Sequence, residues 1–144
     1  MTRSIKNSEG VTYSEKEAGS EKPYDEVNDK YICDQGTMMA LNNEEITAQN
    51  ASKNYTGEDA FFSQSKSGTK PADSFDNAKH GKAAAVIGGE HVVTYYGTSN
   101  DGTVYVYSKD GQRYKPEVKP LSTVIRQMID RGMNTSTIKY YTKK

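Results

Sequence analysis

The densest run of hydrophobic residues lies between 91 and 109. The stretches HVVTYYG (91–97) and TVYVYSK (103–109) are rich in β-branched and aromatic residues, and the SNDG sequence between them is typical of a turn. This pattern predicts an antiparallel hairpin. The first stretch is hydrophobic at nearly every position, which indicates a strand covered on both faces. The sequence KDGQ (109–112) indicates a turn after the second strand.

Farther along the chain the hydrophobic residues follow the period of a helix. They stand at positions i, i+3, i+4, i+7 and i+8 of one stretch: Leu121, Val124, Ile125, Met128 and Ile129. Pro120 precedes this stretch and Gly132 follows it, as expected at the two ends of a helix. The pattern therefore predicts a helix between Pro120 and Gly132, and STIKYYTK (136–143) predicts a final strand.

The pattern in the first half of the chain is less regular. A helix with Thr37 as its N-cap is expected within residues 33–50. A second short helix is expected at 56–63, where a capping-box pattern precedes two phenylalanines. Residues 64–74 are expected to form a loop, and 75–87 to contain another helical turn before a run of small residues.

Residues 1–30 contain few hydrophobic side chains and many Glu, Lys and Ser residues. Hydrophobic residues make up 33% of the whole chain and its mean hydropathy is −0.89, so part of the chain is expected not to pack. Because a polar segment buries too little surface to offset its ordering entropy, we expect 1–30 to be a flexible polar leader. Residues 31–144 are expected to form one α+β domain, with short N-terminal helices packed on a small antiparallel β-sheet.

The composition also bears on location and cofactors. No hydrophobic run approaches the roughly 18 residues of a membrane span, and the first residues lack the hydrophobic centre of a signal peptide. We therefore expect no membrane contact, and either a cytoplasmic location or delivery by a specialised secretion system. A single cysteine cannot form an internal disulfide, and no Cys and His residues have zinc-ligand spacing. Neither a metal nor another cofactor is expected.

The net charge of the chain is zero, but the charges are unevenly distributed. Residues 1–103 carry 10 Lys or Arg against 16 Asp or Glu, whereas residues 104–144 carry 9 against 3. A basic C-terminal surface would attract an anionic partner such as RNA or a cell-wall polymer. The alternative interpretation is that the two parts complement each other within the fold.

Two residues stand where a thiol hydrolase needs them. Cys33 lies just before a predicted helix, whose N-terminal amides and dipole stabilise a thiolate. His91 begins the first strand of the hairpin, which is a rigid platform for a general base. The spacing of the hairpin places His91 opposite Lys109, within one residue, so that Ser108 and Asp110 come within reach. A carboxylate both orients an imidazole and stabilises its charged form, which makes Asp110 the expected third catalytic residue.

This arrangement resembles the papain-like cysteine peptidases and amidases of bacteria, which include bacteriocin-processing peptidases and cell-wall amidases. The matching segments are CDQGTMMAL with Cys33, GGEHVVTYYG with His91 and DGTVYVYSKDG with Asp110, and the resemblance spans residues 31–112. It implies a thiol hydrolase acting on a peptide or peptidoglycan substrate. By analogy with toxin and effector domains, a cognate inhibitor protein is an expected partner.

The chain departs from that family beside the cysteine. Asp34 places a negative charge next to Cys33, which should raise the pKa of the thiol. Gln35 is the only nearby side chain that could donate to an oxyanion.

Two further functions are compatible with the sequence. A metal-independent ribonuclease of the toxin type needs two acid–base groups and a cation, which His80, Lys82 and His91 could supply for an RNA substrate. A non-catalytic adaptor could instead use the tyrosine-rich hairpin as its binding face.

Overall fold

The hairpin predicted from the sequence forms the centre of the fold. The computed structural model describes the placement of residues 4–6, 12–14, 23–55, 61 and 68–144. The strand β5 (His91–Thr98) pairs with β6 (Val104–Ser108) along one edge and with β4 (Ala83–Ile87) along the other. All residues of β5 except the last are buried, which confirms the prediction of a strand covered on both faces.

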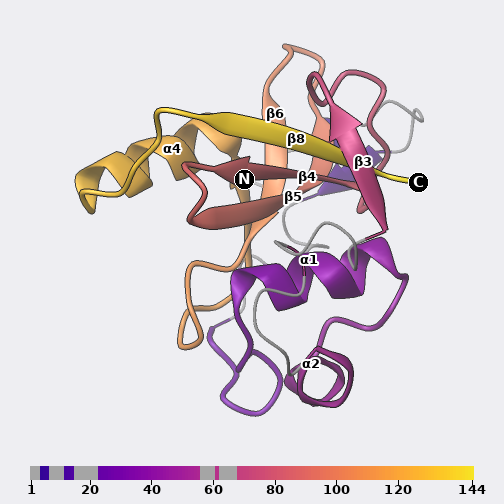
Figure 1. Cartoon of the computed structure of the whole chain (residues 1–144), viewed down its shortest axis with the longest axis vertical. Helices are drawn as coiled ribbons and strands as arrows, with labels where there is room; N and C mark the ends of the chain where they lie inside the picture. The colour runs from indigo at the N-terminus through magenta and orange to yellow at the C-terminus, as the bar shows by residue number, and fades with distance from the viewer. Residues whose placement is uncertain (1–3, 7–11, 15–22, 56–60, 62–67) are drawn as a thin grey trace.

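The sheet extends from β5 in both directions (Figure 1). Beyond β4 come β8 (Ile138–Lys143) and then β3 (Thr69–Ala72), whereas β7 (Glu117–Pro120) pairs with β6. Two short strands, β1 (Ser4–Lys6) and β2 (Thr12–Ser14), pair with each other, and β1 also pairs with the last residue of β5. Each of these pairings is antiparallel.

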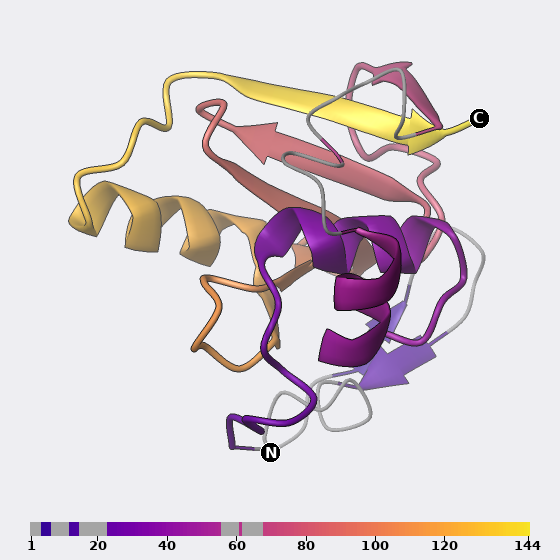
Figure 2. The same ribbon diagram turned by 60° about the horizontal axis from the view of Figure 1, so that its bottom comes forward.

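Helices cover both faces of the sheet. The helices α1 (Cys33–Leu41) and α2 (Ala48–Asn54) lie on one side, and α4 (Leu121–Asp130) lies on the other (Figure 2). Because side chains alternate along a strand, β4 and β5 contribute to two separate cores. The core under α4 includes Val93, Tyr95, Val124 and Met128, and the core under α1 includes Met38, Leu41, Ala84 and Val92.

The described residues form a small α+β fold, as expected. The hairpin and the final strand are present, and the predicted C-terminal helix runs from Leu121 to Asp130. Gly132 follows this helix with a φ of 74°, the left-handed conformation that commonly ends a helix. One detail of the predicted hydrophobic stripe is wrong, because Ile129 is 57% exposed.

The helix α1 begins earlier than the sequence predicted, at Cys33. The side chain of Gln35 accepts a hydrogen bond from the backbone N–H of Ile32 at 2.9 Å, which satisfies an amide just before the helix. Thr37, expected to be the N-cap, instead hydrogen bonds through its hydroxyl to Thr94 of β5 at 2.9 Å. Cys33 therefore occupies the first helical position rather than the loop before it.

The expected single helix within residues 33–50 is divided in two. After Leu41 the chain turns through Asn43, whose φ of 56° is not helical. A new helix, α2, then begins with Thr47 as its N-cap, since the Thr47 hydroxyl accepts the N–H of Asn50 at 3.1 Å.

Other expectations for the first half of the chain also change. Residues 69–72, expected to lie in a loop, form β3 because they pair with β8. No helical turn precedes residue 83 in the described stretch from 73, which contains bends and turns. The helix expected at 56–63 lies outside the described residues, except for Phe61. Within the expected leader, residues 1–30, the structure describes β1, β2 and residues 23–30.

Candidate functional site

A tight turn between β4 and β5 sets the position of His91. Gly88 and Gly89 both have a positive φ, and the N–H of Gly88 donates to a backbone carbonyl just before β8 at 2.7 Å. His91 is then the first residue of β5 and is 7% exposed. Its side chain points to the α4 face of the sheet, where it shares a small cavity with Val124 and Met128.

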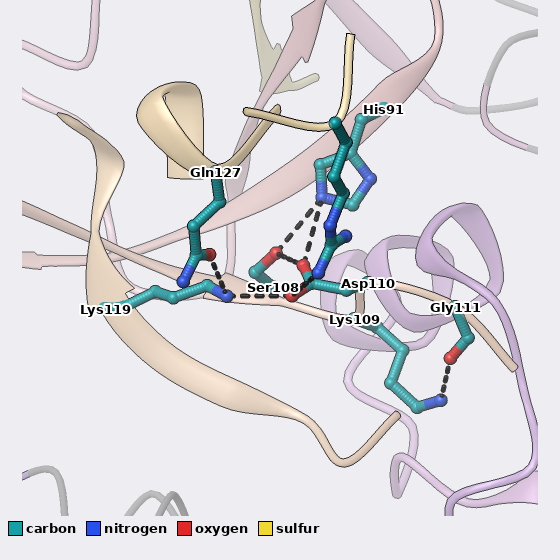
Figure 3. Close-up of polar contacts among 8 residues, drawn as sticks. His91, Ser108, Lys109, Asp110, Gly111, Lys119 and Gln127 are labelled. Atoms are coloured by element: carbon teal, nitrogen blue, oxygen red, sulfur yellow. Dashed lines mark hydrogen bonds and ion pairs between the residues drawn. The ribbon is translucent and has the colours of Figure 1, made fainter. Parts of the chain in front are cut away.

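A chain of hydrogen bonds joins His91 to Asp110 (Figure 3). His91 Nε2 lies 3.1 Å from Ser108 Oγ, and Ser108 Oγ lies 2.8 Å from Asp110 Oδ1. An ionised carboxylate can only accept hydrogen bonds, so the Ser108 hydroxyl donates to Asp110 and accepts from His91. The proton of the neutral imidazole is therefore on Nε2, and Nδ1 carries the lone pair that a general base needs.

Two cations lie beside the Asp110 carboxylate. Lys119 Nζ on β7 lies 2.9 Å from Oδ2 and also donates to Gln127 Oε1 at 2.7 Å, and Arg131 Nη2 lies 3.8 Å from Oδ2. Burial by itself would raise the pKa of Asp110, but the hydrogen bond and charge of Lys119, together with the Ser108 hydroxyl, lower it below 3.8. Asp110 is therefore ionised at neutral pH.

The imidazole of His91 is neutral at the same pH. Burial lowers the pKa of His91 below its ordinary 6.5; the nearby Asp110 opposes this effect, and the charges of Lys119 and Arg131 add to it. The cavity between the imidazole, the Asp110 carboxylate and α4 has a volume of about 20 Å³. This volume is sufficient for about one water molecule.

The register of the hairpin explains why Asp110 comes within reach of His91. Near the turn Gly97 pairs with Tyr105, but beyond it Tyr95 pairs with Val106, so Tyr96 is an extra residue in β5. The bulge shifts the later part of the ladder by one residue. Continued to the start of β5, the register places His91 opposite Asp110, one position from the Lys109 expected at the sequence level.

The thiol of Cys33 lies at the first turn of α1, in contact with the core under that helix. Burial raises the pKa of Cys33 above its ordinary 9.0, and the charge of Asp34 raises it further. The backbone N–H groups of Val92, Asp34 and Cys33 itself act in the opposite direction. The thiol is therefore protonated at neutral pH, although three amides are positioned to stabilise a thiolate.

The structure joins His91 to Asp110 but does not join either of them to Cys33. The imidazole points toward α4, whereas the thiol lies beside Val92 on the α1 face, and no hydrogen bond connects them among the described residues. The two side chains nevertheless lie at the same end of β5. The amide that contacts the sulfur belongs to Val92, the residue that follows His91.

The side chains of the two residues after Cys33 do not assist the thiol. Asp34 is buried and, as expected, its charge raises the pKa of the neighbouring thiol. Gln35 was the expected side-chain donor to an oxyanion, but its Nε2 donates to the carbonyl of Tyr55 at 3.0 Å and its Oε1 holds the N–H of Ile32. The amides at the start of α1 are better placed than Gln35 to stabilise negative charge.

The residues of the expected ribonuclease site do not meet. His80 lies near the far end of β5, where its Nδ1 contacts the carbonyl of Tyr96 at 2.8 Å. Lys82 Nζ donates to the carbonyls of Ala40 and Leu41 at the C-terminal end of α1. His91 is at the opposite end of the β4–β5 pair, because β4 separates it from both residues. Geometry therefore gives no support to a shared acid–base site.

The tyrosines of the hairpin are mostly part of the core rather than a binding face. Tyr95, Tyr96 and Tyr105 are buried. Tyr107 is partly covered, and its hydroxyl lies 2.5 Å from that of Tyr31. Tyr95, Tyr96 and Tyr107 also line a cavity of about 160 Å³ next to α1. The adaptor hypothesis therefore stays a prediction, with this cavity in place of an exposed tyrosine face.

Sequence reasoning missed Lys119. Its strand, β7, was not predicted, because EVKP has no clear period and ends at a proline. A lysine two residues from the predicted helix was a weak signal, since most lysines in such positions are solvated.

Comparison of the chain with protein-family models, with curated proteins and with solved structures found no match. Within the described residues, no three His, Cys, Asp or Glu side chains are grouped as metal ligands would be. Among those same residues, every helix is too short or too polar to cross a bilayer.

Proposed function

We propose that the protein is a thiol hydrolase, a peptidase or amidase in which Cys33 is the nucleophile and His91 the general base. Asp110, acting through Ser108, orients His91. The observation that carries the proposal is the chain from His91 Nε2 to Asp110, because it leaves the lone pair on Nδ1 at the strand end where Cys33 lies. A general base needs such a free lone pair, and a carboxylate behind the hydrogen-bonded nitrogen stabilises the imidazolium that forms.

The reaction follows from these groups. Nδ1 of His91 takes the proton from Cys33, and the thiolate attacks the carbonyl carbon of a peptide or peptidoglycan amide. The backbone N–H groups of Asp34 and Cys33, at the start of α1, stabilise the negative charge on the Cys33 sulfur. The C–N bond then breaks, the leaving amine takes the proton from His91, and water hydrolyses the thioester to release a carboxylate and restore the thiol.

The proposal requires one rearrangement. The thiol must leave its contact with the Val92 amide and reach Nδ1 of His91, which is attached to the preceding residue. Catalytic contacts are often longer in the absence of substrate than in the reacting complex. Here the thiol and the imidazole lie on opposite faces of β5, so the rearrangement has to bring the thiol past the end of the strand.

Alkylation tests the proposal directly, because Cys33 is the only cysteine in the chain. The rate of modification by iodoacetamide is measured by mass spectrometry at neutral pH. We expect His91→Ala to slow the reaction at least about tenfold, since general-base assistance contributes about 100-fold or more to rate. The matched control is His80→Ala, which removes the other histidine and should leave the rate unchanged.

The same variants separate this function from the alternatives. A Cys33→Ala protein should lose hydrolysis of a peptide-amide and peptidoglycan-fragment panel. The proposal fails if His91→Ala is alkylated as fast as the unmodified protein, or if Cys33→Ala retains hydrolysis. RNA cleavage by Cys33→Ala that is lost in His91→Ala would point to the ribonuclease instead.

A further inference from the structure

Lys109 is a buried lysine between two residues of the site. Its side chain is 2% exposed, although lysines are rarely buried in proteins. Ser108 and Asp110, on either side of it, point to His91 on the α4 face. Figure 3 shows the Lys109 side chain directed away from that group, toward the carbonyl of Gly111.

The ammonium of Lys109 is held by three backbone carbonyls from two parts of the chain. Nζ donates to Gly111 and Gln112 in the loop after β6, at 2.6 and 3.2 Å, and to Tyr31 at 2.8 Å. Three N–H donors thus match three acceptors. Because Tyr31 precedes Cys33 by two residues, one side chain links the start of α1 to the strand end that carries Asp110.

Aromatic contacts strengthen the same connection. Lys109 Nζ lies 4.6 Å from the centre of the Tyr31 ring, within range of a cation–π interaction. The Tyr31 hydroxyl is hydrogen bonded to that of Tyr107 on β6 at 2.5 Å. Farther back, the Tyr24 hydroxyl donates to the carbonyl of Gln112 at 3.3 Å. Residues 24–31 are therefore fastened to β6 and to the loop that follows it.

Burial of the Lys109 ammonium carries a desolvation penalty that a hydrophobic side chain would not have. Burial lowers the pKa of Lys109 to about 8, against the opposing effect of the charges on Asp29 and Asp110. A hydrophobic side chain of similar volume often stabilises a fold as well as a buried charge does. The geometry that Lys109 imposes is a better reason for its presence than the stability it adds.

We infer that Lys109 is a positioning residue that holds the start of α1, and with it Cys33, at the strand end that carries His91 and Asp110. It does so by tying the Tyr31 carbonyl, at the entrance to α1, to the Gly111–Gln112 loop. The inference rests on the proposed function, because it assigns to the link the task of holding the start of α1 beside the end of β5, from which the thiol would reach its base.

The test compares lysines that hold opposite ends of α1. Lys109→Met releases the N-terminal end. The control, Lys143→Met combined with Lys82→Met, releases the C-terminal end, where Lys143 Nζ donates to the Leu41 carbonyl at 2.6 Å and Lys82 Nζ to the Ala40 and Leu41 carbonyls at 3.2 Å; Lys143→Met alone is the single-site control. All variants are checked for folding by circular dichroism and thermal unfolding. Lys109→Gln, which keeps two N–H donors, is the second variant if Lys109→Met does not fold.

The readout is the alkylation rate of Cys33 with and without His91. Lys109→Met should slow alkylation at least about tenfold, because a misplacement near 1 Å can cost about 100-fold in rate. When His91 has already been replaced by Ala, Lys109→Met should not slow alkylation further, since both changes act through the same assistance of Cys33 by His91. Both controls should match the unmodified protein at equal folded fraction.

Other outcomes overturn the inference. Faster alkylation of Lys109→Met both with and without His91 would show that Lys109 merely covers the thiol. Equal effects of Lys109→Met and the control would show a general loss of helix stability. If His91→Ala slows alkylation and Lys109→Met does not, only the positioning role is lost. If His91→Ala has no effect, the proposed function fails first.

Discussion

At the scale of single residues, the chemistry of the site depends on which nitrogen of His91 carries its proton. Ser108 determines the tautomer: its hydroxyl donates its one proton to Asp110, so it can only accept a hydrogen bond from His91 Nε2. We expect Ser108→Ala to leave the Nε2–H without its acceptor, at a cost of about 1–3 kcal/mol in the free energy of unfolding. The fraction of the Nδ1–H tautomer should rise at the same time, as measured by nitrogen NMR chemical shifts of the imidazole.

Thr94→Val supplies a control for the Ser108 prediction. It removes a different buried hydrogen bond, between Thr94 and Thr37, and should cost a similar amount of stability. It should not move the nitrogen shifts of His91. An unchanged tautomer in Ser108→Ala would show that Ser108 does not set the protonation of the ring.

The pKa of His91 predicts how stability depends on pH. Burial, the largest effect, places the native pKa below the 6.5 of the unfolded chain. As pH falls through 6.5 the unfolded chain binds more protons than the native state, so the free energy of unfolding decreases. Denaturant unfolding should show this loss of stability between about pH 7 and pH 5, and the loss should largely disappear in His91→Gln.

His80→Gln is the control, because it keeps His91 and should show the same loss of stability. If the free energy of unfolding of the unmodified protein does not change over this pH range, the prediction is wrong.

At the scale of elements, the β4–β5 turn determines where His91 begins its strand. Gly88 has a φ of 61°, and a Cβ there would lie 1.9 Å from the carbonyl oxygen of Asn134. Gly89 has a similar φ of 71°, but its Cβ would meet nothing within 4 Å. Gly89→Ala should therefore lower the free energy of unfolding by about 1–2 kcal/mol, because an L-residue is strained at this φ. Gly88→Ala should lower it clearly more, because the backbone at Asn134 must also move. Thermal unfolding of the pair measures the difference, and equal costs would show that the contact relaxes freely.

Elements with a strong local pattern could be predicted from the sequence, and those that depend on distant contacts could not. The hairpin and α4 have clear periods, and Asp110 could be placed near His91 from hairpin spacing alone. The register at the turn could not be predicted, because Gly97 pairs with Tyr105, and the bulge at Tyr96 then shifts the ladder so that the predicted partner of His91 is wrong by one residue. The start of α1 depends on a hydrogen bond from Ile32 to Gln35, and β3 depends on β8, which lies about 70 residues later.

At the scale of the whole molecule, two lysines of the basic C-terminal part donate to main-chain carbonyls of the acidic N-terminal part near the two ends of α1. Lys109 reaches the carbonyl of Tyr31, and Lys143 reaches that of Leu41. Lys119 and Arg131 instead surround Asp110, which belongs to the basic part itself. The two lysines at the ends of α1 help to place that helix on the sheet, whereas complementarity between the acidic and basic parts stays a prediction.

The strand β8 joins strands of the sheet that are far apart in the sequence. It lies between β4 and β3, and its Tyr140 and Tyr141 pack edge-on against Phe75 and Phe61, with ring centres 5.0 and 5.7 Å apart. Removal of residues 138–144 would leave β3 without this partner and expose an edge of β4. We expect the truncated chain to lose its cooperative thermal transition, whereas removal of Lys144 alone should shift the midpoint by less than about 3 °C. A sharp transition in the truncated chain would mean that β5, β6 and the helices fold without β8, and that the site could be studied in a smaller unit.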